Sequence, residues 1–240
     1  MQAYLDQFLF GIYPYIGLSV FIVGSLIRFD REQYTWRSGS SQLLRTKQLR
    51  WGSNLFHFGI LFLLMGHFVG LLTPHVVYEL FVTAEAKQML AIVSGGIAGT
   101  ACFVGLTMLV HRRLTEPRIR ATSTTMDIAI LLLLWLQLVL GLVTIPYSLQ
   151  HSDGSVMLAL SEWAQRIVTL RAGAADMIAG VAWPYRLHLV LGVTIFLVFP
   201  FSRLVHIWSA PVGYVFRRYQ VVRARGNGRA VAAKSTGRRP

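Results

Sequence analysis

Cysteine and charged residues are both scarce in this sequence. Cys102 is the only cysteine among 240 residues, which excludes an intramolecular disulfide, a cysteine-bound iron–sulfur cluster and a C-x-x-C-H attachment site for covalent haem. Charged residues make up 14% of the chain and hydrophobic residues 54%, a balance too apolar for a soluble domain of this length. The composition therefore predicts a membrane protein in which Cys102 is a small buried side chain.

Long runs without a single charged residue take up much of the chain. Four such runs are each close to the roughly 20 residues that a membrane-spanning helix needs. They cover residues 8–27, 51–72, 88–110 and 128–149. A fifth apolar run lies between Arg186 and Arg203, and we interpret it as a span with charged ends. The predicted fold is therefore all-α, an integral membrane bundle of five transmembrane helices.

The basic residues are distributed unevenly over the segments between these runs. Six follow the first run, four follow the third, and nine lie between Arg203 and the end of the chain. The opposite side holds four, which are Lys87, Arg166, Arg171 and Arg186. The positive-inside rule then predicts a periplasmic N-terminus and a cytoplasmic C-terminus for a multi-pass protein of the cell inner membrane. This topology explains the formal net charge of +13, which therefore does not indicate a nucleic-acid partner.

The two ends of the chain differ in composition. No basic residue precedes the first apolar run, so we expect this run to remain as the first helix and not to be cleaved as a signal peptide. Residues 223–240 contain almost no large apolar residue, which is typical of a disordered basic segment near anionic lipid. We predict a five-helix membrane domain over residues 1–222 and a basic, disordered cytoplasmic tail over residues 223–240.

Four of the seven histidines lie in the predicted spans, and polar side chains in a bilayer usually face a site or a partner. His57 and His67 belong to the second span, where ten residues separate them by about 15 Å along one side of a helix. His188 and His206 belong to the fifth, where eighteen residues place them on one face, and helix tilt or a bend at Pro200 would absorb the difference in rise. Because the two spans run in opposite directions, we expect His57 to be level with His206, and His67 with His188. A buried histidine with satisfied hydrogen bonds remains the alternative for any one of them.

Each of these two histidine pairs offers only two ligands, and this number limits which metal or metal cofactor the pair could bind. Zinc needs four ligands, and no Cys, Asp or Glu is placed in the spans to complete such a set. A haem iron needs only two axial ligands, so the two levels predict two haems b. His57 and His206 would bind the haem on the cytoplasmic side, and His67 and His188 the haem on the periplasmic side.

Two arginines flank the histidines of the fifth span. Arg203 lies three residues before His206, on nearly the same helix face, and Arg186 lies close to His188 at the outer boundary. We predict that both guanidinium groups pair with haem propionates, because arginine binds carboxylates with two parallel hydrogen bonds. Snorkelling of these side chains to the lipid headgroups is the alternative.

Glycines recur every seven residues in the second span, at Gly52, Gly59 and Gly66. They drift by only about 20° around the helix at each step, so they form a bare strip on one side. This strip is open either to a flat macrocycle or to a closely packed helix.

A series of motifs in one order covers nearly all of residues 8–225. They read IYPYI, YTWRSGSSQ, SNLFHFGIL, GHFVGLLTPH, RIRATS, TIPYS, RLHLVLG and FPFSRLVHIWS. In these motifs the chain resembles the gamma subunits of respiratory nitrate reductase, membrane cytochromes b that anchor the complex and oxidise quinol. The resemblance implies two haems b on His57, His67, His188 and His206, with the same pairing.

The resemblance also implies a quinol site beside the outer haem. In the family a lysine in the loop after the second helix acts there, and the stretch AEAKQ places this role on Lys87, with Gly66 and His67 at the inner wall of the site. The implied partners are the iron–sulfur beta subunit and the molybdenum-containing alpha subunit of nitrate reductase.

The predicted function is electron transfer within a quinol-oxidising nitrate reductase. Quinol would be oxidised near the periplasm, and the electrons would pass through both haems to the cytoplasmic iron–sulfur subunit, for the reduction of nitrate to nitrite. The chain would not reduce nitrate by itself, because it offers no oxyanion site and no ligand pattern for molybdenum. Three alternatives remain open on the sequence. They are a related di-haem cytochrome b of a sulfur or heterodisulfide complex, a transporter or proton channel with intramembrane histidines, and a passive anchor.

Overall fold

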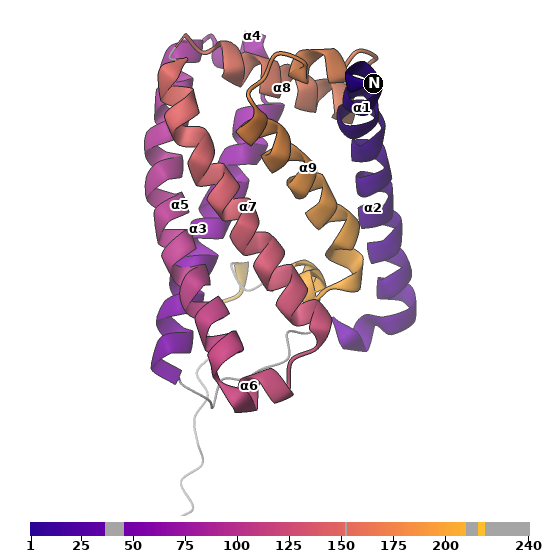
Figure 1. Ribbon diagram of the computed structural model, residues 1–240, viewed down its shortest axis with the longest axis vertical. Helices are drawn as coiled ribbons and strands as arrows, with labels where there is room; N and C mark the ends of the chain where they lie inside the picture. The colour runs from indigo at the N-terminus through magenta and orange to yellow at the C-terminus, as the bar shows by residue number, and fades with distance from the viewer. Residues whose placement is uncertain (37–45, 152, 210–215, 219–240) are drawn as a thin grey trace, which may run out of the picture. The chain divides into compact units, whose positions relative to one another are not determined.

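The computed structural model describes residues 1–36, 46–151, 153–209 and 216–218, and every regular element in them is a helix (Figure 1). Five helices are long and apolar enough to cross a membrane. They are Gln2–Glu32, Lys47–Leu72, Ala84–Thr115, Thr125–Gln150 and Trp183–Phe201. The predicted all-α fold with five candidate spans is confirmed, while the predicted tail over residues 223–240 lies outside the described residues.

The spans are built from helices of different kinds. The first joins α1 (Gln2–Asp6), a π-helical stretch (Gln7–Ile12) and α2 (Tyr13–Glu32). The next three are α3 (Thr46–Leu72), α5 (Ala84–Thr115) and α7 (Thr125–Gln150), and the fifth is α9 (Trp183–Val198) with the 3₁₀ turn Phe199–Phe201. The short helices are α4 (His75–Tyr78), α6 (Pro117–Ala121) and α8 (Ser155–Val168). Further 3₁₀ segments are Gln33–Thr35, Ala175–Ile178 and Arg203–Ser209.

Two of the spans begin at side-chain caps. At the start of α5, the Thr83 hydroxyl accepts a hydrogen bond from the Ala86 amide at 3.3 Å. At the start of α7, Thr124 and Asp127 form a reciprocal capping box. These bonds satisfy amide groups that have no partner within the helix, so both helices extend beyond the charge-free runs.

The spans pack as a series of neighbours, α3 against α5, α5 against α7, α7 against α9, and α9 against α2. Glycines let α3 and α5 approach closely, since a Cβ on Gly59 would lie 2.6 Å from Cys102 Cβ, and one on Gly105 would lie 2.5 Å from the Phe56 amide nitrogen. Close packing at small residues is a main source of helix association in a membrane. Cys102 is fully buried in this contact, as predicted.

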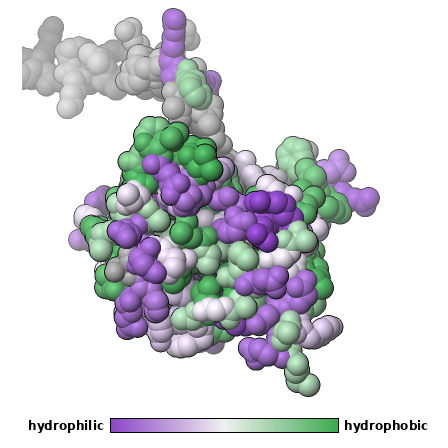
Figure 2. Space-filling view, turned by 90° about the horizontal axis from the view of Figure 1, so that it is seen from above, coloured by the Kyte–Doolittle hydropathy of each residue, from purple (hydrophilic) through white to green (hydrophobic). Residues whose placement is uncertain are grey.

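The end of the bundle that carries α4 and α8 is also the end where the N-terminus lies, and α6 lies at the opposite end (Figure 1). The indole of Trp163 on α8 is buried and donates a hydrogen bond to Phe10 O at 2.9 Å. Seen from this end, hydrophilic residues are spread over the surface among apolar ones (Figure 2). α8 lies between the fourth and fifth apolar runs, where the sequence patterns above predict no helix.

The fifth span ends before the last predicted haem ligand. α9 ends at Val198, and after one 3₁₀ turn the backbone of Ser202 is extended, with φ −113° and ψ 176°. His206 lies beyond this break, in the 3₁₀ segment Arg203–Ser209. The prediction that His188 and His206 share one face of a helix is therefore wrong. Pro200 explains the break, because proline has no N–H to donate within a helix.

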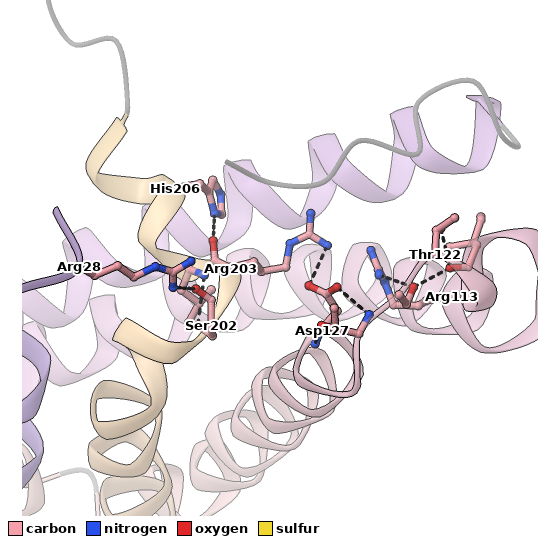
Figure 3. Close-up of polar contacts among 11 residues, drawn as sticks. Arg28, Arg113, Thr122, Asp127, Ser202, Arg203 and His206 are labelled. Carbon is pink, nitrogen blue, oxygen red and sulfur yellow. Dashed lines mark hydrogen bonds and ion pairs between the residues drawn. The ribbon is translucent and has the colours of Figure 1, made fainter. Parts of the chain in front are cut away.

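Arg28 at the end of α2 stabilises this break. Its Nη1 atom donates hydrogen bonds to Pro200 O at 2.6 Å and to Ser202 O at 2.9 Å (Figure 3). The two carbonyls have lost their helical partners where α9 ends, so a guanidinium group supplies the missing donors. The position of the segment that carries His206 therefore depends on α2.

Candidate functional site

Three of the four predicted haem ligands share one hydrogen-bond arrangement. In each, the ring Nδ1 atom lies close to a backbone carbonyl oxygen three or four residues earlier. The contacts are His57 to Ser53 O at 2.7 Å, His67 to Leu63 O at 2.7 Å and His206 to Arg203 O at 2.6 Å. Because a carbonyl can only accept, Nδ1 carries the proton and Nε2 keeps its lone pair. Metal-binding histidines are held in this way, with Nε2 free for the metal.

The structure brings His67 and His188 together. Their ring centroids lie 6.1 Å apart, with an angle of 34° between the ring planes. Two imidazoles on one iron place their centroids about 6 Å apart, because a metal–nitrogen bond is about 2.0 Å and the nitrogen lies about 1.1 Å from the ring centroid. The two residues come from different spans, His67 from α3 and His188 from α9. The pair therefore fits the axial ligands of one haem iron.

The surface of α3 leaves room beside His67. A Cβ on Gly66 would meet no atom within 4 Å, whereas Gly52 and Gly59 lie against α5. The glycine strip thus divides between its two predicted uses, close helix packing at one end and open space at Gly66. Side chains that are more than half exposed along α3 include Phe58, Leu61, Phe62, Met65 and Phe68. Such an apolar surface suits a macrocycle or lipid chains.

His57 and His206 are placed without a mutual contact. His57 is exposed on α3, and Ser53 Oγ provides a second contact to its Nδ1 atom at 3.1 Å. His206 is partly buried beside the carbonyl of Arg203 (Figure 3). No ring contact joins the two histidines among the residues that the structure describes, so their pairing on one haem stays a prediction.

The two predicted propionate partners are both paired with carboxylates of the chain. Arg186 forms an ion pair with Asp6, and its guanidinium carbon lies 5.1 Å from the centroid of the Phe10 ring. Arg203 Nη1 lies 3.8 Å from a carboxylate oxygen of Asp127, the capping residue of α7 (Figure 3). Both guanidinium groups are thus placed to bind carboxylates, and their role toward propionates stays a prediction.

Lys87 lies in the first turn of α5 with its amino group over the ring of Tyr78. The distance from Nζ to the ring centroid is 3.6 Å, and within residues 1–36, 46–151, 153–209 and 216–218 the buried Nζ atom has no hydrogen-bond partner. Tyr78 is 8% exposed, and both burial and the neighbouring Glu79 raise the pKa of its phenol, so the ring stays neutral. A buried amino group without an acceptor is costly. Lys87 is therefore available to donate to an oxygen of a ligand.

A pocket of about 290 Å³ lies beside Tyr78. Its lining residues are His75, Tyr78, Leu158, Ser161, Glu162 and Gln165. Ser161 and Gln165 also donate hydrogen bonds to Gly70 O and Leu71 O, at 3.2 and 3.1 Å, which ties α8 to the end of α3 nearest His67. Lys87 and this pocket are therefore both next to Tyr78, at the end of the bundle closed by α8.

Two residues of α7 that contact His188 were missed by the sequence analysis. Gln137 Nε2 donates to His188 O at 3.1 Å and lies 3.3 Å from the ring Nε2 atom. A Cβ on Gly141 would lie 3.1 Å from His188 Cε1, so the ring packs directly against the glycine. A lone glutamine within the charge-free run 128–149 was the signal that could have found Gln137.

The all-helical fold, the five candidate spans and the spacing of the His67 and His188 rings are those expected of the class of membrane cytochromes b. Comparison with known proteins identifies the family, because the family model for the nitrate reductase gamma subunit matches residues 6–225. The chain belongs to this family, the membrane cytochrome b subunits of respiratory nitrate reductase. It is accordingly a multi-pass inner membrane protein, and the family implies haem as its cofactor.

The similar proteins extend over nearly the full chain. It is 55% identical over 224 residues to the respiratory nitrate reductase 1 gamma chain of Escherichia coli (strain K12), covering 93% of this chain and 100% of that relative. The respiratory nitrate reductase 2 gamma chain of the same organism is 55% identical over 225 residues, covering 94% and 100%. The nitrate reductase gamma chain of Bacillus subtilis (strain 168) is 38% identical over 220 residues, covering 91% and 98%. These matches favour a nitrate reductase over a sulfur or heterodisulfide complex.

Proposed function

We propose that this chain oxidises a membrane quinol near the periplasm and passes the electrons through two haems b to an iron–sulfur beta subunit. A molybdenum-containing alpha subunit then reduces nitrate to nitrite. The N-terminus is periplasmic and the C-terminus cytoplasmic in this proposal, as the distribution of basic residues indicates. The observation that carries the proposal is the 6.1 Å separation of the His67 and His188 rings, which come from different spans.

Each haem is held by one histidine of α3 and one histidine that follows it in the last third of the chain. His67 and His188 would hold the periplasmic haem, and His57 and His206 would hold the cytoplasmic one. When bound, each haem supplies a one-electron iron couple. The chain's own contribution is to hold the rings, through Nδ1 hydrogen bonds that leave Nε2 free at His57, His67 and His206.

Arg186 and Arg203 bind the propionates in this proposal. Each already lies at a carboxylate, Asp6 for Arg186 and Asp127 for Arg203, and a propionate presents the same group. Arg203 is bonded to His206 through its own carbonyl oxygen, so the cation and the ligand belong to one turn of chain.

The quinol site is formed by Lys87, Gly66 and His67. Lys87 donates a hydrogen bond to a quinol oxygen, which gives its buried amino group an acceptor that the described residues do not supply. Gly66 leaves open space for the quinol ring next to His67. Oxidation of the quinol to the quinone releases two electrons to the protein and two protons to the periplasmic side.

A reduced-minus-oxidised spectrum of the purified complex tests the proposal. We expect a b-type α band and two haems per chain. His57→Ala and His206→Ala should each remove one and the same haem, and His67→Ala and His188→Ala the other. The lack of a b-type band would overturn the electron-transfer role, and loss of different haems from the first two variants would overturn the pairing.

Lys87→Ala tests the quinol site separately. A hydrogen bond from a charged donor is worth about 1.5–3 kcal/mol, so we expect kcat/KM for quinol to fall roughly 10- to 100-fold while both haems stay bound. Lys47→Ala is the matched control, because Lys47 is an exposed lysine in the first turn of α3 and is not a predicted quinol-site residue. An unchanged quinol oxidation rate in Lys87→Ala would contradict this assignment.

A further inference from the structure

His188 is the exception among the four predicted ligands. Its Nδ1 atom is buried and has no hydrogen-bond partner among the residues that the structure describes, whereas the other three rings each use a carbonyl of their own segment. Buried polar atoms without a partner are rare and call for a physical explanation. A metal-binding imidazole in particular needs an acceptor on the nitrogen that does not bind the metal.

An unused acceptor lies on the side chain next to this ring. Gln137 Oε1 on α7 is buried and also has no hydrogen-bond partner in the described part of the chain, while Gln137 Nε2 donates to His188 O at 3.1 Å. The same Nε2 atom is 3.3 Å from His188 Nε2. A half turn of the imidazole about its Cβ–Cγ bond exchanges Nδ1 with Cδ2 and Nε2 with Cε1 without moving the backbone. Nδ1 then takes the ring position bonded to the one that lies 3.3 Å from Gln137 Nε2.

Two glycines make the space for this contact. A Cβ on Gly141 would lie 3.1 Å from His188 Cε1, and a Cβ on Gly192 would lie 3.3 Å from Gln137 Nε2. Gly141 follows Gln137 by one helical turn, and Gly192 follows His188 by one turn, so both lie on the facing sides of α7 and α9. The His188 ring therefore packs on Gly141 of α7, and the Gln137 amide packs on Gly192 of α9.

We propose that Gln137 is the positioning residue for His188, with its Oε1 atom accepting a hydrogen bond from Nδ1 and its Nε2 atom remaining on His188 O. This inference rests on the proposed role of His188 as an iron ligand. The amide then fixes both the ring plane and the nitrogen that faces the iron. An acceptor on Nδ1 makes the imidazole a stronger electron donor and stabilises the ferric state. Gln137 thus lowers the reduction potential of the haem next to the quinol site.

Other contacts between α7 and α9 are independent of Gln137. The Tyr185 hydroxyl lies 2.6 Å from Ser148 Oγ and donates to Thr144 O at 3.2 Å. These bonds keep the register of the two helices when Gln137 is replaced. Gln137→Leu removes the amide at similar side-chain volume, and Gln137→Asn keeps an amide but withdraws it from the ring by one methylene group.

The test is a redox titration of the purified complex, with the outer haem identified as the one that His67→Ala lacks. In Gln137→Leu the ferrous/ferric equilibrium of the outer haem should shift about tenfold toward the ferrous state. For a one-electron couple this corresponds to an increase of about 59 mV in the reduction potential. The low-spin ferric EPR signal of that haem should shift as well, because the ring plane is released, and the inner haem should be unchanged. Gln137→Asn should give a shift in the same direction.

Gln48→Leu is the matched control. Gln48 makes the same pair of contacts, to Met108 O at 3.1 Å and to a ring nitrogen of His111 at 3.3 Å, but at a histidine that is not a predicted ligand. Both haem potentials should be unchanged in this variant. The inference is overturned if the ferrous/ferric equilibrium constant of the outer haem in Gln137→Leu stays within twofold of wild type. If that variant does not assemble, the same result in Gln137→Asn overturns it. A wild-type complex without two haems b would instead overturn the proposed function.

Discussion

Replacing Gly59 by alanine should destabilise the protein, whereas the same change at Gly66, on the same helix, should not. The new Cβ at Gly59 would lie 2.6 Å from Cys102 Cβ and 2.9 Å from Ala98 O, so α3 and α5 must move apart. Overpacking of this kind costs about 1–3 kcal/mol, and the higher helix propensity of alanine returns up to about 1 kcal/mol. Because both variants gain the same propensity term, we expect the free energy of unfolding of Gly59→Ala to be about 1–3 kcal/mol lower than that of Gly66→Ala.

Gly66→Ala is the matched control for this prediction, because its Cβ would meet no atom within 4 Å. Both variants add one methyl group to the apolar helix α3, so the propensity terms cancel in the comparison. Unfolding of the detergent-purified proteins, followed by circular dichroism against denaturant, measures the difference. Equal stability of the two variants would refute the conclusion that the strip divides between helix packing and open space. Slower quinol oxidation in Gly66→Ala alone would add support for the quinol site.

Three further predictions follow from the polar contacts. Tyr78→Leu should slow quinol oxidation roughly 2- to 30-fold, since a cation–π contact with Lys87 is worth about 0.5–2 kcal/mol, while Tyr78→Phe keeps the ring and should stay near wild type; equal rates in the two variants would argue against the contact. Arg203→Ala should change the potential or the content of the inner haem alone, as a redox titration would show, and unchanged values would count against a propionate role. Arg28→Ala should weaken the binding of the inner haem, because the carbonyl of Ser202 loses its donor and the segment that carries His206 is released. The haem content per chain would measure this loss, and full retention of that haem would contradict the role of Arg28.

The all-α fold and the five spans could be predicted from the sequence because a bilayer imposes them locally. Each span must be about 20 residues long and almost free of charge, whatever its neighbours are. The four candidate histidines were also visible from the sequence, since polar rings stand out in runs such as residues 51–72. The amphipathic helix α8 was not, because its packing partner Phe10 is more than 150 residues away in the chain.

Tertiary structure decided which of these residues meet. The 6.1 Å contact between His67 and His188 depends on how α3 and α9 are held apart, and no spacing along one helix determines that distance. The place of His206 depends on the break after α9, where the effect of Pro200 outweighs helical periodicity. The contact of Gln137 with His188 depends on the register of α7 and α9, which long-range side-chain bonds set. Local transfer energies thus determined the spans and the candidate ligands, while packing between distant segments determined the site.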